Sequence, residues 1–83
     1  MLKGSVVRSL AGRDKDLLLA VTYADERWIC VCNGKERPLH NPKRKNAKHV
    51  EALEQRLSED QMQSDKSLRK ALAIIKSEMK SRR

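Results

Sequence analysis

Residues 17–34 read LLLAVTYADERWICVCNG, and the expected fold is built outward from them. The first part, 17–23, is an apolar run, and residues 27–32 alternate between two faces of an extended chain. Short runs rich in β-branched and aromatic side chains, bounded by Gly and Asp, are typical of strands. The pair Asn33-Gly34 is the strongest short-range hairpin signal, because a type I′ turn needs positive φ at both central residues. We therefore expect two strands here, with residues 35–39 folding back beside the second.

The flanking segments extend this pattern into a small barrel. Residues 3–10 (KGSVVRSL) form a further strand-like run, and we expect Gly12–Asp16 to be the loop that joins it to residues 17–23. Residues 47–53 fit either a helix or a closing strand. We prefer a fifth strand, because four short strands leave a sheet edge that needs a partner. Five short strands with turn signals at this spacing predict a mainly β fold, a small five-stranded barrel.

A helix is expected at the C-terminus. Residues 54–64 are polar and weakly patterned, which favours a connector. The apolar side chains Leu68, Ala71, Leu72, Ile75 and Met79 then recur at helical spacing, which predicts an amphipathic helix over about 66–81. Ser64 or Asp65 suits its N-cap, and Lys80, Arg82 and Arg83 suit the negative C-terminal end of its dipole. The chain is thus divided into a barrel (1–53), a connector (54–64) and a helix with a basic tail (65–83).

Composition points to a basic binding module. The 83 residues carry a net charge of +8; residues 1–50 hold 11 cationic and five acidic side chains, so most of the excess lies there. Such an excess predicts polyanionic partners. A chain this short buries only about 60% of its unfolded surface, which leaves little room for a deep catalytic cavity. With no run of 18 apolar residues and no signal-peptide pattern at the start, we expect a cytoplasmic protein that does not bind membranes.

The most basic stretch is NPKRKNAKH at 41–49. Pro38 and Pro42 keep the backbone out of helix, so we expect a constrained loop. A solvated loop or a linker would explain the same composition. The alternative is a grip on phosphates, in which Arg binds in a bidentate fork and Lys acts as a point charge. Because Trp28 and Tyr23 are the only aromatic residues, the composition argues against stacking platforms for single strands and favours recognition of folded RNA by shape and backbone.

The order of these motifs resembles the KOW-motif family. The resemblance covers about residues 3–50 and rests on KGSVVRSLAGRDKD, LLLAVTY, Asp25, WICVCNGKERPL and NPKRKNAKH. It is closest to the large-subunit ribosomal KOW proteins of archaea and eukaryotes and to their small bacterial RNA-binding relatives. What it implies is an SH3-like barrel that binds ribosomal or another structured RNA without catalytic activity. The chain departs from the family at Asp16, where Gly is usual; Asp tolerates positive φ at modest cost, so we expect a retained but strained turn.

The resemblance and the charge pattern together nominate the candidate RNA-binding residues. They are Arg13, Lys15, Arg37, Asn41, Lys43, Arg44, Lys45, Asn46, Lys48 and His49. The alternative for Gly12–Lys15 is a turn that only connects two strands, with Asp14 as a local cap of backbone amides. The basic side of the helix, Arg69, Lys76 and Lys80, is interpreted as a solvent face, with an auxiliary RNA contact or a partner helix as the alternatives.

Other functions have weaker support in the sequence. Cys30 and Cys32 are read as reduced, buried small hydrophobes. A zinc site from these two with His40 and His49 does not match the usual ligand spacing. No catalytic motif or cofactor signature is present, and no small-molecule substrate is expected. The second functional hypothesis is an adaptor that docks an acidic protein with its barrel or its helix. Besides RNA, the ribosome or ribosomal proteins are candidate partners.

Overall fold

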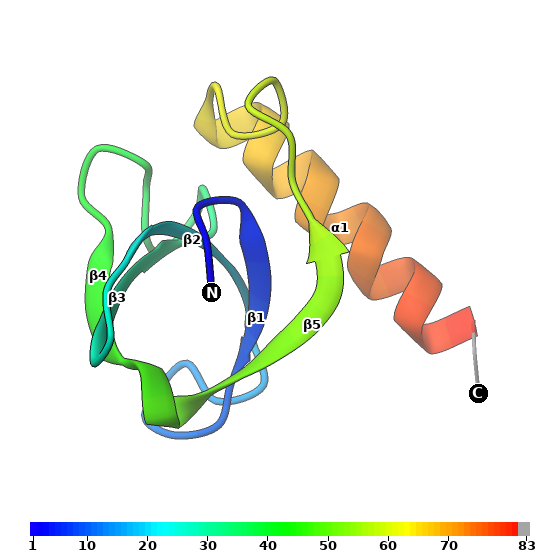
Figure 1. Cartoon of the computed structure of the whole chain (residues 1–83). Helices are drawn as coiled ribbons and strands as arrows, with labels where there is room; N and C mark the ends of the chain where they lie inside the picture. Colours follow the sequence, from blue (N-terminus) through cyan, green and yellow to red (C-terminus); the bar gives the residue numbers. More distant parts are fainter. Residues whose placement is uncertain (82–83) are drawn as a thin grey trace.

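The protein is a small SH3-like barrel with a C-terminal helix, as predicted (Figure 1). The computed structural model describes residues 1–81, with only the backbone of Lys80 and Ser81, so the predicted tail at Arg82 and Arg83 lies outside the described residues. The elements are β1 (Ser5–Ser9), β2 (Leu18–Ala24), β3 (Trp28–Cys32), β4 (Lys43–Asn46), the 3-10 helix η1 (Ala47–His49), β5 (Val50–Arg56) and α1 (Asp65–Ser81). The strands form one antiparallel sheet in the order β4-β3-β2-β1-β5.

One face of the curved sheet forms the interior of the barrel. Because successive side chains of a strand point to opposite faces, alternate residues of each strand meet inside. This interior cluster consists of Val7, Leu19, Val21, Ile29, Val31 and Val50. It is entirely aliphatic, which a chain without Phe requires.

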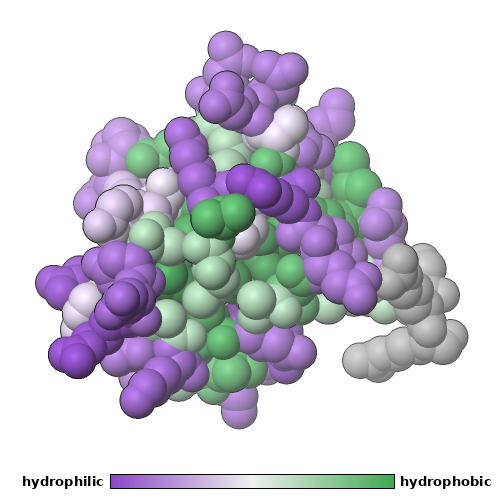
Figure 2. Space-filling model, in the orientation of Figure 1, coloured by the Kyte–Doolittle hydropathy of each residue, from purple (hydrophilic) through white to green (hydrophobic). Residues whose placement is uncertain are grey.

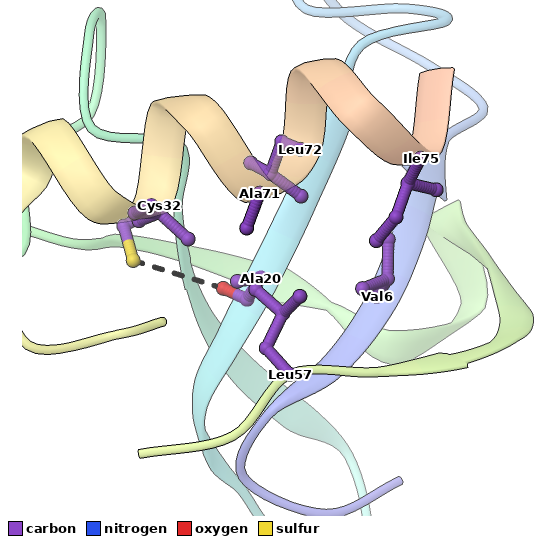
Figure 3. Packing of buried hydrophobic residues seen from close by; sticks show 8 residues of the cluster. Val6, Ala20, Cys32, Leu57, Ala71, Leu72 and Ile75 are labelled. Carbon is purple, nitrogen blue, oxygen red and sulfur yellow. Dashed lines mark hydrogen bonds between the residues drawn. The ribbon is translucent and has the colours of Figure 1, made fainter. Parts of the chain in front are cut away.

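Helix α1 covers part of the outer face of the same sheet (Figures 1 and 3). The predicted stripe is confirmed: Leu68, Ala71, Leu72 and Ile75 are buried, and Met79 packs at the margin. Their partners are Val6, Ala20, Cys32 and Leu57. The Cys32 thiol is directed at the carbonyl of Ala20 at 3.8 Å, and burial raises the pKa of this thiol to about 11. Barrel and helix therefore share one apolar cluster.

The predicted start of the helix is confirmed, and the predicted fifth strand lies three residues later than expected, because residues 47–49 form η1. Ser64 is the N-cap, since its hydroxyl oxygen accepts a hydrogen bond from the backbone N–H of Ser67 at 3.1 Å. Strand β5 runs to Arg56, and Leu57 is buried beneath α1. Residues 54–57 thus belong to the barrel and its core, and the boundary at residue 53 was placed too early.

The prediction of a two-residue hairpin turn at Asn33-Gly34 was wrong. Gly34 has positive φ (78°), but Asn33 does not, so the turn is not type I′. The Asn33 side chain instead accepts hydrogen bonds from the N–H groups of Lys35 and Arg37, each at 3.0 Å, and closes a local loop. The strand that pairs with β3 starts only after Pro42, and it is β4, Lys43–Asn46. Most of the basic stretch is consequently an edge strand followed by η1, rather than a loop.

The turn between β1 and β2 is retained, although residue 16 is Asp and not Gly. Asp16 has φ 71°, the left-handed conformation expected at this position. Its carboxylate lies 3.0 Å from the guanidinium of Arg8, which also binds Glu51 of β5. No helix within residues 1–81 is both long and apolar enough to cross a membrane.

Candidate nucleic-acid interface

The β1–β2 turn is tied to β4 by a buried ion pair. The Lys45 ammonium donates to Asp14 Oδ1 and to the carbonyl of Ala11, both at 3.1 Å, and the Ser9 hydroxyl donates to the same Asp14 oxygen at 2.9 Å. Lys45 is only 7% exposed. The interpretation of Asp14 as a local backbone cap was therefore wrong, because its carboxylate binds side chains of two strands. The ammonium group of Lys45, a candidate RNA ligand, is therefore bound by groups of the protein itself.

Asp14 is ionised in this setting. Burial by itself would raise the pKa of its carboxyl group. The hydrogen bonds from Ser9 and Lys45, with the charges of Lys45 and Lys43, outweigh burial and lower this pKa below its ordinary value. Asp14 Oδ2 is buried without a hydrogen bond, 3.5 Å from the Lys43 ammonium. The turn that carries Arg13 is thereby held against β4.

Three of the predicted cations meet around one cavity. Arg13 from the β1–β2 turn, Arg37 from the loop before β4, and Lys43 at the start of β4 line a hollow of about 270 Å³. We call these three residues the cationic rim. Leu17 and Leu19 supply apolar lining in the same hollow. Within residues 1–81 the guanidinium groups of Arg13 and Arg37 have no ion-pair partner, which leaves both free to bind an external anion.

A second hollow continues this surface onto the helix. It measures about 320 Å³ and shares Leu17, Asn33 and Glu36 with the first. Lys35 and Lys76 line it, together with Arg69, whose guanidinium donates to the carbonyl of Gly34 at 2.6 Å. The basic side of α1 thus lies beside the loop that carries Arg37. In the sequence, the position of Lys76 on the basic side of the predicted helix was the one sign of this surface. The contact between loop and helix could not be predicted, because it depends on the tertiary fold.

The other candidates occupy different surroundings. Arg44 points outward from β4, and its guanidinium carbon lies 4.2 Å from the centre of the Trp28 ring. Asn46 is half-buried and caps η1, since its side-chain oxygen accepts from the N–H of Lys48 at 2.9 Å. The remaining four, which are Lys15, Asn41, Lys48 and His49, are exposed. Hydrophilic side chains gather over the β3–β4 side of the barrel, at the left and lower left of Figure 2.

Another hollow, larger than the one at the cationic rim, does not match a polyanion. It has a volume of about 500 Å³ and is lined by one cationic side chain, Lys3, and two acidic ones, Glu59 and Asp60. The hollow at the cationic rim also has two acidic side chains in its lining, Asp14 and Glu36, but its three cations outnumber them, so it is the better candidate for a phosphate despite its smaller size.

The residues of the zinc alternative do not converge. Cys32 is buried beneath α1, whereas His40 and His49 are exposed on the surface. Among the described residues, no three His, Cys, Asp or Glu side chains gather in a way that could hold a metal ion.

No protein-family model matches the chain, and no curated protein matches its sequence.

Proposed function

We propose that this chain is a non-catalytic RNA-binding protein that holds structured RNA, ribosomal or other, through phosphate contacts at the cationic rim. The observation that carries the proposal is the convergence of Arg13, Arg37 and Lys43 from three separate segments around one hollow. A guanidinium can bind two phosphate oxygens at once, and those of Arg13 and Arg37 have no ion-pair partner among the residues that the structure describes. The net charge of +8 and the KOW-like order of motifs point to the same class of ligand.

A purely structural explanation of the charges on β4 competes with this proposal. β4 is an edge strand, and charged side chains on such edges discourage pairing with other chains. That explanation accounts for Arg44 and Lys43. It does not account for Arg13 and Arg37, which lie outside the strands and whose guanidinium groups have no ion-pair partner in the described part of the chain.

The test compares two double variants of equal charge. Arg13→Gln with Arg37→Gln removes two charges from the rim, and Lys66→Gln with Lys70→Gln removes two from α1, on residues that line neither basic hollow. We expect the rim variant to bind a folded ribosomal RNA fragment at least tenfold more weakly at moderate salt, because both lost contacts are charge-assisted. The helix variant should lose much less.

Equal losses for the two double variants would show that only overall charge matters, and would contradict the assignment of the rim. Both variants should give the far-UV circular dichroism and thermal midpoint of the parent, since all four side chains lack ion-pair partners within residues 1–81.

One specific observation favours the adaptor hypothesis. Ile74 on α1 is 52% exposed, and it lines a shallow hollow together with Ala71 at one edge of the buried stripe. If a protein partner docks there, capture from a cell lysate should survive nuclease treatment and be lost in Ile74→Lys. If RNA binding is the function, nuclease should release the captured partners, and Ile74→Lys should leave RNA affinity unchanged.

A further inference from the structure

Both aromatic residues of the chain lie on one uncovered face of the sheet. In the strand register, Cys30 of β3 pairs with Tyr23 of β2 on one side and with Arg44 of β4 on the other. Trp28 lies two residues along β3 from Cys30 and so projects from the same face. Helix α1 covers this outer face at Cys32 but leaves its other end open. We call Tyr23, Trp28 and Arg44 the outer aromatic face.

The packing within the barrel does not explain these side chains. Tyr23 is 57% exposed, and Arg44 is also exposed. Neither the Tyr23 hydroxyl nor the Trp28 indole N–H makes a hydrogen bond within the described residues. Arg44 lies over the Trp28 ring, with its guanidinium carbon 4.2 Å from the ring centre, and its side chain is exposed to an incoming group.

This arrangement has the chemistry that binds an unpaired base. Bases of single-stranded loops stack on aromatic rings and on Arg guanidinium planes. Arg44 also supplies a positive charge for the neighbouring phosphate, and it directly follows Lys43 of the cationic rim on β4. Because neighbouring side chains of a strand point to opposite faces, Lys43 and Arg44 lie on the two sides of this edge strand, and an RNA that passes round the edge from the rim places its next nucleotides on the outer aromatic face.

We propose that the RNA bound by this protein carries unpaired nucleotides, and that one or two of their bases stack on Tyr23 and on the Arg44–Trp28 pair. The inference rests on the proposed RNA binding and narrows its ligand to RNA with a loop or bulge. Low aromatic content argued against stacking, but it could not reveal that the two aromatic residues lie on the same face.

The test uses the full chain with two RNAs of equal length, a hairpin with an unpaired loop and a fully paired duplex. Trp28 is the only Trp, so its fluorescence reports on this face alone. We expect the loop RNA, but not the duplex, to quench Trp28. Tyr23→Ala should weaken loop-RNA binding about tenfold, whereas Tyr23→Phe should keep it, because stacking needs the ring and not the hydroxyl.

Arg44→Lys provides a second measurement that does not depend on the Tyr23 variant. It keeps the charge and removes the planar guanidinium, so it should weaken loop-RNA binding more than duplex binding. Equal binding of the two RNAs by the parent, or unchanged loop-RNA affinity in both Tyr23→Ala and Arg44→Lys, would overturn this inference alone. Failure to bind either RNA would overturn it together with the proposed function.

Discussion

The Asp14–Lys45 pair ties the first turn to β4 through a charge-assisted hydrogen bond of 3.1 Å. Its two oxygens and the Lys45 ammonium are nearly enclosed, with 12% and 7% of the side chains exposed. Removing one partner of such a pair leaves the other charge buried, which typically costs about 3 kcal/mol or more. The predicted effect therefore lies in stability rather than in RNA contact.

Asp14→Asn is expected to lower the free energy of unfolding at pH 7, by about 1.4 kcal/mol for each unit by which folding lowers the pKa of Asp14. Because the folded-state pKa of Asp14 lies below its unfolded value of about 3.9, the pair contributes fully above that pH. Its contribution is lost as the pH falls through the lower, folded-state pKa. Urea unfolding at several pH values should show the two proteins converging in acid. A difference that persists unchanged at low pH would contradict the role of Asp14.

The left-handed Asp16 gives a separate prediction about backbone strain. Asp16→Gly and Asp16→Ala both remove the exposed ion pair with Arg8, which contributes little. They differ in tolerance of φ 71°, so the Gly variant should be more stable than the Ala variant by about 1 kcal/mol. Thermal unfolding measures this difference. Equal stabilities would mean that the turn relaxes away from the left-handed conformation.

At the scale of single residues, some backbone conformations could be predicted from the sequence, whereas the burial of charged side chains could not. The left-handed backbone of Asp16 could be predicted, because this turn position favours Gly and Asp is one of the few other residues that tolerate positive φ. The burial of Lys45 was not, because the composition of PKRKN is the same whether a lysine faces solvent or a carboxylate 31 residues away. A pairing across that distance depends on the closure of the barrel.

At the scale of elements, the 33–42 loop and the start of α1 are fitted to each other. Gly34 lies against the backbone of Asp65, and the Asp65 carboxylate accepts a hydrogen bond from the N–H of Leu39 at 2.8 Å. A Cβ at Gly34 would collide with the Asp65 carbonyl oxygen, whereas one at Gly12 would meet only an ordinary contact of 3.5 Å with Asp14. The two glycines share a positive φ, so they form a matched pair.

Gly34→Ala is accordingly expected to destabilise the protein by about 3 kcal/mol, since overpacking adds to backbone strain. Gly12→Ala should cost only the strain, about 1 kcal/mol. Urea unfolding, with Cys32 alkylation as a sign that α1 has lifted, distinguishes the two. Similar losses of stability in both variants would show that α1 does not pack closely against the loop at Gly34.

This contact also explains the failed hairpin prediction. An Asn-Gly pair predicts a two-residue turn when local preference alone decides. Here Gly34 is required by the helix packed against it, and Pro38 and Pro42 cannot donate to a ladder. The amphipathic helix itself was predictable almost to the residue, because its apolar period and its Ser64 cap are local signals.

For the whole molecule, the barrel and α1 act as one unit. The cluster beneath the helix joins side chains from β1, β2, β3 and the helix, so a chain cut before α1 would expose Val6, Ala20 and Cys32. The barrel class followed from strand count and turn signals. The site did not follow as directly, because the cationic rim draws on three segments that only the folded sheet brings together.

The salt dependence of RNA affinity tests the central claim most directly. Each phosphate contact adds about 0.7–0.9 to the slope of log affinity against log salt concentration. The parent protein should bind folded RNA with a steep slope, and Arg13→Gln with Arg37→Gln should flatten it by about 1.5, while Lys66→Gln with Lys70→Gln leaves it nearly unchanged. An identical slope for the parent and the rim variant would contradict the cationic rim as the RNA-binding site.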